Sequence, residues 1–217
     1  MSVSPPPSPA AAPAPRAPAH TEHRQRLLDG LAMALADRPF SEVKIGDIVA
    51  LAHVSRRTFY EQFPSKEDCL LALGERLSDQ TLALIAQNYR FDADWVSQLR
   101  AVTAAFLASL AAQPAVLKAV YMDLLTLGGR GLALRRRMGE RFGQFLIAQV
   151  EVFRMQEPQK RPLSPALATA IIGGVNELIL QAIERGEAHR LGELTPTVTA
   201  FIEAVIASLE SPAPSAD

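Results

Sequence analysis

Ser55 and the residues beside it limit how the stretch from 50 to 70 can fold. Serine is a favoured helix N-cap because its hydroxyl accepts a hydrogen bond from a backbone N–H of the first turn. Val54 precedes this serine and Phe59 follows it, which is a spacing that allows a hydrophobic staple. A proline ends the segment, and Ser65, with an acid three residues later, is a variant of the capping box. The pattern predicts a short helix, about Arg56–Gln62, with a long helix after it.

Apolar residues upstream predict two more helices. The leucines within Leu27–Leu35 recur at helical spacing and follow Thr21, a usable N-cap. The apolar positions within Val43–Val49 mark a short second helix, and Leu51–Ser55 is a tight turn. Two short helices joined by such a turn form a helix-turn-helix, whose second helix can lie in the major groove of DNA.

The rest of the chain continues in helical patterns. Alanine and leucine abound while aromatic residues make up 6% of the chain, which favours helices over sheets. Ser164-Pro165 and Thr195-Pro196 each place a cap before a proline, which is tolerated at the first helical position. The fold class is therefore all-α, with about nine helices. The other expected helices are Asp94–Ala112, Pro114–Leu125 and about Leu132–Arg154.

Four regions are expected along the chain. Residues 1–19 are rich in Pro and Ala and should form a disordered arm, because prolines block helix propagation. Residues 20–68 are expected to form the helix-turn-helix domain, residues 69–210 a larger helical domain, and residues 211–217 a disordered tail.

Composition argues against several classes of protein. The net charge of −1 means that any contact with DNA must come from local basic patches. Cys69 is the one cysteine, so no intramolecular disulfide can form. The apolar run Ala101–Ala112 is too short and too polar to cross a bilayer, and no secretory signal is recognisable. We therefore expect a cytoplasmic protein without membrane contact, metal or cofactor.

The start of the third helix carries groups suited to DNA. An arginine fork can take O6 and N7 of guanine together, which suits Arg56 and Arg57 to reading base edges. Thr58 can donate or accept a hydrogen bond there, and Tyr60 and Lys66 are placed for phosphates. The full set of expected DNA-contacting residues is Lys44, Ser55, Arg56, Arg57, Thr58, Tyr60 and Lys66.

Residues Arg24–Leu73 resemble the DNA-binding domain of the TetR family of bacterial repressors. The resemblance lies in the runs Phe40–Ile48, Val54–Phe63 and Ser65–Asp68. It implies a homodimer, a helical domain for effector binding and dimerisation in residues 69–210, and release from operator DNA when the effector binds. By position, Tyr60 and Lys66 take the family's phosphate-contacting places.

Two positions depart from the family pattern. His53 stands where the turn usually has glycine, and a residue there is expected to adopt a positive φ, which histidine tolerates better than most residues. Val43 and Lys44 stand where threonines are frequent. Whether Lys44 supplies a phosphate contact in their place stays open at this stage.

The last two helices predict a dimer, and the preceding ones a pocket. A helix that is apolar on much of its circumference needs burial on more than one side, and a palindromic operator demands two-fold symmetry. The expected dimer interface comprises Ile171, Val175, Leu178, Ala182, Phe201 and Val205. The residues expected to line an effector pocket are Trp95, Phe106, Tyr121, Met122, Phe142 and Asn176.

Three alternatives remain open at this stage. An enzyme is disfavoured because no phosphate loop, His-Glu-x-x-His metal motif or nucleophile elbow is present. A helical ligand-binding or interaction protein that has lost DNA binding is disfavoured because the expected DNA-contacting residues of the third helix and Lys66 are all present. A DNA-binding regulator without an effector, or one that activates, has the same sequence features as a repressor.

Overall fold

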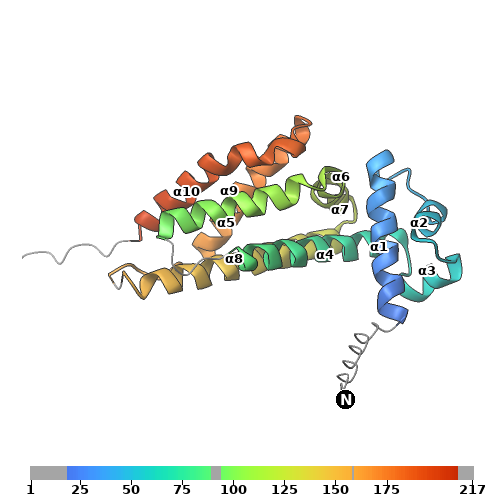
Figure 1. Ribbon diagram of the computed structural model, residues 1–217, viewed down its shortest axis with the longest axis horizontal. Helices are drawn as coiled ribbons and strands as arrows, with labels where there is room; N and C mark the ends of the chain where they lie inside the picture. The colour runs from blue at the N-terminus through green and yellow to red at the C-terminus, as the bar shows by residue number, and fades with distance from the viewer. Residues whose placement is uncertain (1–18, 89–93, 158, 210–217) are drawn as a thin grey trace, which may run out of the picture.

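A computed structural model describes residues 19–88, 94–157 and 159–209. The expected arm, except for Ala19, and the expected tail lie outside these residues. The described chain is all-α, as expected, and contains no β-strand (Figure 1). Its helices are α1 (Ala19–Asp37), α2 (Ile45–Ala52), α3 (Arg56–Gln62), α4 (Lys66–Gln87), α5 (Trp95–Ala111), α6 (Pro114–Lys118), α7 (Leu124–Thr126), α8 (Gly129–Arg154), α9 (Pro165–Glu184) and α10 (Thr195–Ala207).

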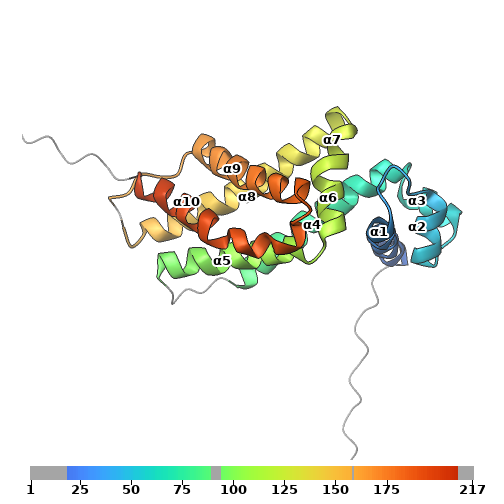
Figure 2. The same ribbon diagram turned by 90° about the horizontal axis from the view of Figure 1, so that it is seen from above.

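The helices form a small group and a larger bundle. Helices α1 to α3 gather at one end, and α4 leaves that group to run along the bundle formed with α5, α8, α9 and α10 (Figures 1 and 2). Helix α6, the π-helical turn Ala119–Asp123 and α7 follow one another without a break and contact α1 and α8. Counted as one, they bring the described chain to nine helical rods, besides a 3₁₀ helix at Ala188–Leu194.

Helix α1 holds α2 at close range. A Cβ atom on Gly30 would lie 2.6 Å from the carbonyl oxygen of Ile48, so only glycine permits this crossing. The guanidinium of Arg26 donates to the carbonyl oxygens of Ala52, at 3.0 Å, and of His53, at 2.5 Å. These bonds satisfy carbonyl groups at the end of α2 that have no partner within the helix.

Three of the five expected caps are present, and the prediction for Thr21 is wrong because α1 already begins at Ala19. Ser55, Ser65 and Ser164 are N-caps whose hydroxyls accept from the backbone N–H three residues later. The prediction for Thr195 is wrong, because this residue is the first of α10 and its hydroxyl donates to the carbonyl of Gly192 at 2.7 Å. The 3₁₀ helix leads directly into α10, so no free first turn remains to be capped.

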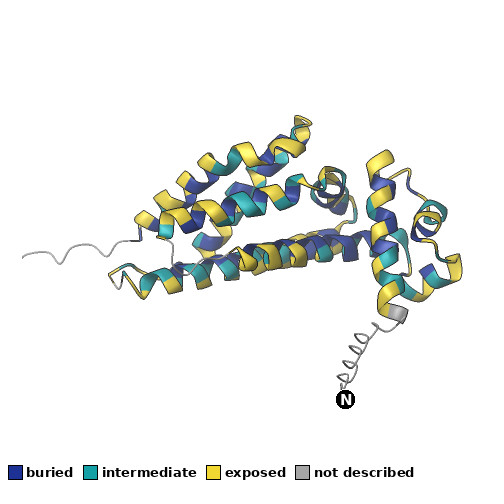
Figure 3. Ribbon diagram, viewed as in Figure 1, coloured by how far each residue is buried: buried dark blue, intermediate teal, exposed yellow. Residues whose placement is uncertain are grey.

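Helix α9 packs its apolar residues into its own chain. Three residues expected in the dimer interface are buried within the bundle: Ile171 at 0%, Val175 at 5% and Ala182 at 3% exposure. Their burial within the chain corrects their assignment to an interface. Buried positions lie beside exposed ones along the helices of the bundle (Figure 3). By length and composition α9 could cross a membrane, as could α5 with the bent segment Pro114–Thr126, but buried core helices meet the same criteria.

Candidate nucleic-acid interface and effector cavity

The first turn of α3 is fixed at both its cap and its core side. The Ser55 hydroxyl accepts from the Thr58 N–H at 3.0 Å and lies 2.9 Å from the Thr58 hydroxyl. Phe59 is fully buried and makes an edge contact with the Tyr60 ring. The anchored turn leaves the side chains of Arg56 and Arg57 exposed to solvent.

The two arginines differ in what surrounds them. Arg57 is 90% exposed and forms an ion pair with Glu61 at 3.0 Å, one turn along the helix. Such exposed pairs contribute little free energy, so Arg57 can exchange its partner at small cost. Arg56 approaches Gly46 in the first turn of α2 and borders a shallow groove, which Lys44 and Tyr60 also line. This groove and the exposed turn of α3 bring most of the expected DNA-contacting residues onto one side of the domain.

Lys66 performs a structural role that its sequence position does not reveal. Its ammonium donates to the carbonyl oxygens of Phe40 at 3.0 Å, Ser41 at 3.3 Å and Val43 at 2.9 Å, and lies over the Phe40 ring. An ammonium has three donors, and all three are engaged here. In this conformation Lys66 ties the α1–α2 loop to the start of α4 and also borders the groove lined by Lys44 and Tyr60, so its expected phosphate contact stays a prediction.

Two further expectations concern residues near the turn. His53 has φ 52° and ψ 45°, which confirms the expected left-handed conformation. Lys44 is the N-cap of α2, and its backbone N–H donates to the carboxylate of Asp47 at 2.9 Å. A cap through the acid at the third helical position explains how α2 begins without a threonine cap.

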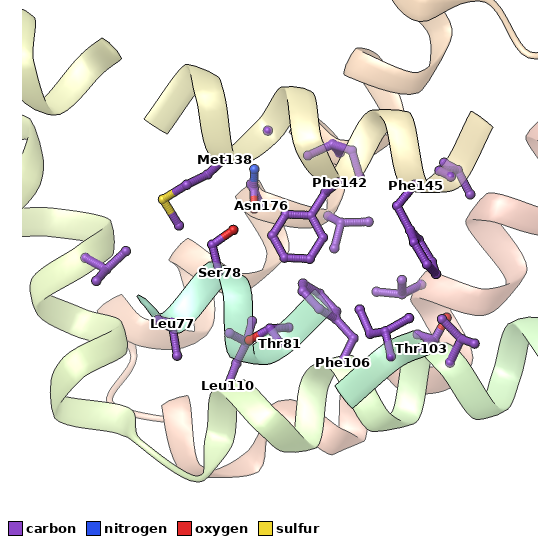
Figure 4. Close-up of a pocket in the computed structure, with 18 of the residues that line it drawn as sticks. Leu77, Ser78, Thr81, Thr103, Phe106, Leu110, Met138, Phe142, Phe145 and Asn176 are labelled. Carbon is purple, nitrogen blue, oxygen red and sulfur yellow. The ribbon is translucent and has the colours of Figure 1, made fainter. Parts of the chain in front are cut away.

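An apolar cavity of about 140 Å³ lies within the bundle (Figure 4). Four of the six residues expected in a pocket line it: Phe106, Tyr121, Phe142 and Asn176. The rings of Phe106 and Phe142 meet edge to face at 5.6 Å.

The other two expected pocket residues do not line the cavity. Trp95 is not part of the cavity wall, and its ring stacks on the ring of Phe153 with centroids 4.8 Å apart. Met122 lies on the π-helical turn Ala119–Asp123 and is 39% exposed to solvent.

Polar groups reach the cavity from the π-helical turn, α4, α8 and α9. The Tyr121 hydroxyl donates to Asn176 Oδ1 at 2.8 Å, and burial raises the pKa of Tyr121, so the phenol keeps its proton. Ser78 of α4 and Arg135 of α8 also line the cavity, and sequence analysis missed both. For Ser78 the available signal was a hydroxyl directly after Leu77 in the apolar stripe of α4.

Cys69 lies in the core between the two groups of helices. It is fully buried, and burial raises the pKa of its thiol to about 12. A protonated thiol is a poor nucleophile, so Cys69 acts here as a packing group.

Residues 27–73 match the family model of the bacterial regulatory proteins of the tetR family. The matched segment contains α2, α3 and the first part of α4, so the similarity to this family lies in the helix-turn-helix part of the chain. Over 57 residues it is 42% identical to the HTH-type transcriptional regulator EthR of Mycobacterium tuberculosis. That alignment covers 25% of this chain and 26% of the relative, so the chain spans about a quarter of the length of the curated relatives it matches.

Solved structures are similar in fold to a larger part of the chain than the segment 27–73 that matches the family model. A putative TetR-family regulator from Syntrophomonas wolfei has a TM-score of 0.69 and 21% identity, covering 86% of this chain and 96% of that one. FadR from Bacillus subtilis, solved with stearoyl-CoA, has a TM-score of 0.70 and 17% identity, covering 82% and 96%. At these identities the likeness is one of fold alone.

Proposed function

We propose that this protein is a DNA-binding transcriptional repressor that binds a palindromic operator as a homodimer and is released by a small, largely apolar effector. The observation that carries the proposal is the exposed, capped first turn of α3. Its arginines sit on a short helix fixed by Ser55 and Phe59, in a segment that matches the tetR family model. A helix in this arrangement can present its N-terminal residues to base edges in the major groove.

Helix α4 offers a route from effector to DNA. Its first residue, Lys66, holds the α1–α2 loop, and Arg76 pairs with Asp29 of α1 at 2.6 Å. Farther along, Ser78 and Thr81 of the same helix line the cavity. A ligand that shifts α4 would therefore shift the whole helix-turn-helix, and it acts only as far as it binds the two arrangements with different affinity. The stearoyl-CoA complex of FadR is a precedent for an apolar ligand within this fold.

The surface of α9 and α10 supports the dimer. Of the residues expected there, Phe201 is 37% exposed, and Leu178 and Val205 are half-buried. Gly173 adds an exposed position where even a Cβ atom would meet open space. We assign the interface to this outer face, with the inner stripe of α9 left to the core.

Binding of the full-length protein to its own upstream DNA, over a range of salt concentrations, tests the proposal. We expect a protected palindrome and an affinity that falls steeply with salt. Arg57→Ala should relax or abolish sequence preference, since a good arginine contact to guanine contributes about 1–3 kcal/mol. Arg136→Ala is the matched control, because Arg136 is an equally charged, exposed residue on α8 that pairs with Glu140 at 3.8 Å. No sequence preference on that DNA or on a randomised pool would overturn the proposal.

A further inference from the structure

The polar groups of the cavity include several donors but no carboxylate. Asn176 Oδ1 accepts from the Tyr121 hydroxyl, and the NH₂ group of Asn176 is a donor that it can offer a ligand. Arg135 lines the same cavity with a guanidinium, which is a donor in every protonation state. None of the described residues that line the cavity is an aspartate or a glutamate.

Ser78 supplies an unused donor at the cavity wall. Its side chain is 1% exposed, and its hydroxyl has no hydrogen-bond partner among the described residues. In Figure 4 this hydroxyl points from α4 toward the space beneath Asn176 and Phe142. A buried polar atom without a partner costs free energy, which a ligand acceptor at this point would recover.

The apolar residues of the cavity wall and the cavity volume limit the size and shape of the apolar part of a ligand. Phe106, Phe142 and Phe145 lie to one side of Ser78 and Asn176 in Figure 4. The volume of about 140 Å³ is close to that of an engineered apolar cavity of about 150 Å³ that binds benzene. A single ring with a short substituent therefore fits without displacing the helices.

We infer that the cavity binds a compact, ring-sized apolar molecule that bears one hydrogen-bond acceptor, a carbonyl or carboxylate oxygen. The Ser78 hydroxyl and the Asn176 NH₂ group donate hydrogen bonds to this oxygen. Organic cations are disfavoured, because they would bring a positive charge to a wall that has no acid and already holds the Arg135 guanidinium. This inference rests on the proposed function in assigning the ligand as effector, but its binding chemistry stands on the cavity alone.

Three probes of one skeleton separate the possibilities in calorimetric titrations of the full-length protein. Acetophenone carries the acceptor, ethylbenzene replaces it with CH₂, and 1-phenylethylamine carries a cation in its place. We expect acetophenone to bind at least as tightly as ethylbenzene, despite the cost of burying a carbonyl. The amine should bind at least about tenfold more weakly than acetophenone. Tighter binding of ethylbenzene or of the amine, or binding of none of the three, would overturn the inference.

Variants locate the acceptor. Ser78→Ala and Asn176→Leu should each weaken acetophenone by about tenfold, as expected for one lost hydrogen bond, and leave ethylbenzene nearly unchanged. Ser97→Ala, at an exposed position on α5, is the matched control for the serine and should change neither. An equal loss for both probes would show a packing effect and refute the assignment. No DNA enters this measurement, so a failure of operator binding and a failure of this inference give separate results.

Discussion

His53 occupies the turn between α2 and α3 with a backbone that favours glycine. Its φ of 52° is the one positive value among non-glycine residues of the described chain. The left-handed region costs an L-residue about 1–2 kcal/mol, whereas glycine enters it freely but loses more entropy on folding. The imidazole has no hydrogen bond among the described residues that would offset this cost.

We predict that His53→Gly raises the free energy of unfolding by about 0.5–1 kcal/mol. Urea unfolding of the variant beside the parent protein measures the difference. His53→Ala is the control, since it removes the ring but keeps the Cβ atom, and it should give no gain. A less stable glycine variant would mean that the histidine side chain itself stabilises the turn.

Lys66 shows how one side chain can hold a domain together. Removing its ammonium would leave the carbonyl groups of Phe40, Ser41 and Val43 without that donor. We predict that Lys66→Met lowers the free energy of unfolding by about 1–3 kcal/mol, since hydrogen bonds from a charged donor are among the stronger ones. Arg57→Ala should lower operator affinity with little change in stability. If Lys66→Met weakened DNA binding at unchanged stability, Lys66 would contact phosphate instead.

At the scale of helices, Gly131 fixes the corner between α7 and α8. A Cβ atom there would collide with the carbonyl oxygen of Leu124, which is backbone and cannot rotate away. We predict that Gly131→Ala costs about 1–3 kcal/mol of stability, as overpacking does. Gly129→Ala is the matched control, because nothing lies within 4 Å of a Cβ atom at Gly129 and alanine favours the helix. Equal stability of the two variants would show that the corner adjusts easily.

A ladder of ion pairs joins α4 and α8, which run in the same direction. Arg130 pairs with Asp68, Arg137 with Glu75 at 3.0 Å, and Arg141 with Asp79 at 2.5 Å. In each pair the arginine follows the acid by the same 62 positions, so the helices keep one register along their contact. The arginine of each pair is about half exposed, so a single pair contributes about 0–1 kcal/mol, and the value of the ladder lies in fixing register.

Charge reversal tests this ladder. We predict that Arg137→Glu lowers stability by up to about 1 kcal/mol at low salt, because it places two carboxylates together, and that adding Glu75→Arg restores it. Urea unfolding at low and high salt measures both, and high salt should shrink the difference. A double reversal that fails to recover stability would show that the pairs are incidental.

These elements also show what a sequence can predict here. Local signals succeeded: Ser55, Ser65 and Ser164 cap the helices where expected, because a cap depends only on residues of the next turn. Contacts across the chain could not be read in this way. The three carbonyls at Lys66 and the partner of Arg137 lie 23 or more positions away.

Periodicity has a related limit. It groups residues on a helix face without saying what covers that face. For this reason Ile171 and Val175 were expected at a dimer interface and are found in the core of the chain. Likewise four of the six expected pocket residues line the cavity, while Trp95 and Met122 were placed there by position alone.

At the scale of the whole molecule, the proposed dimer would connect the outer face of α9 and α10 to DNA recognition through two-fold symmetry. A palindromic site requires two helix-turn-helix groups at a fixed spacing, and a homodimer with an isologous interface supplies them. Phe201, which lies over Gly174 and is 37% exposed, is the largest apolar group that α10 leaves open. A charge at this position would be desolvated in any dimer formed through this face.

We therefore predict that Phe201→Glu converts the protein to a monomer in sedimentation equilibrium and weakens operator binding by at least about a hundredfold, since the two half-sites no longer bind as a unit. Met155→Glu is the control, because Met155 is 80% exposed just beyond the end of α8 and outside the proposed face. It should leave both the mass and the affinity unchanged. If Phe201→Glu remained dimeric and Met155→Glu did not, the interface would lie at the end of α8. A Phe201→Glu protein that is monomeric yet binds its operator with full affinity would separate DNA recognition from dimerisation.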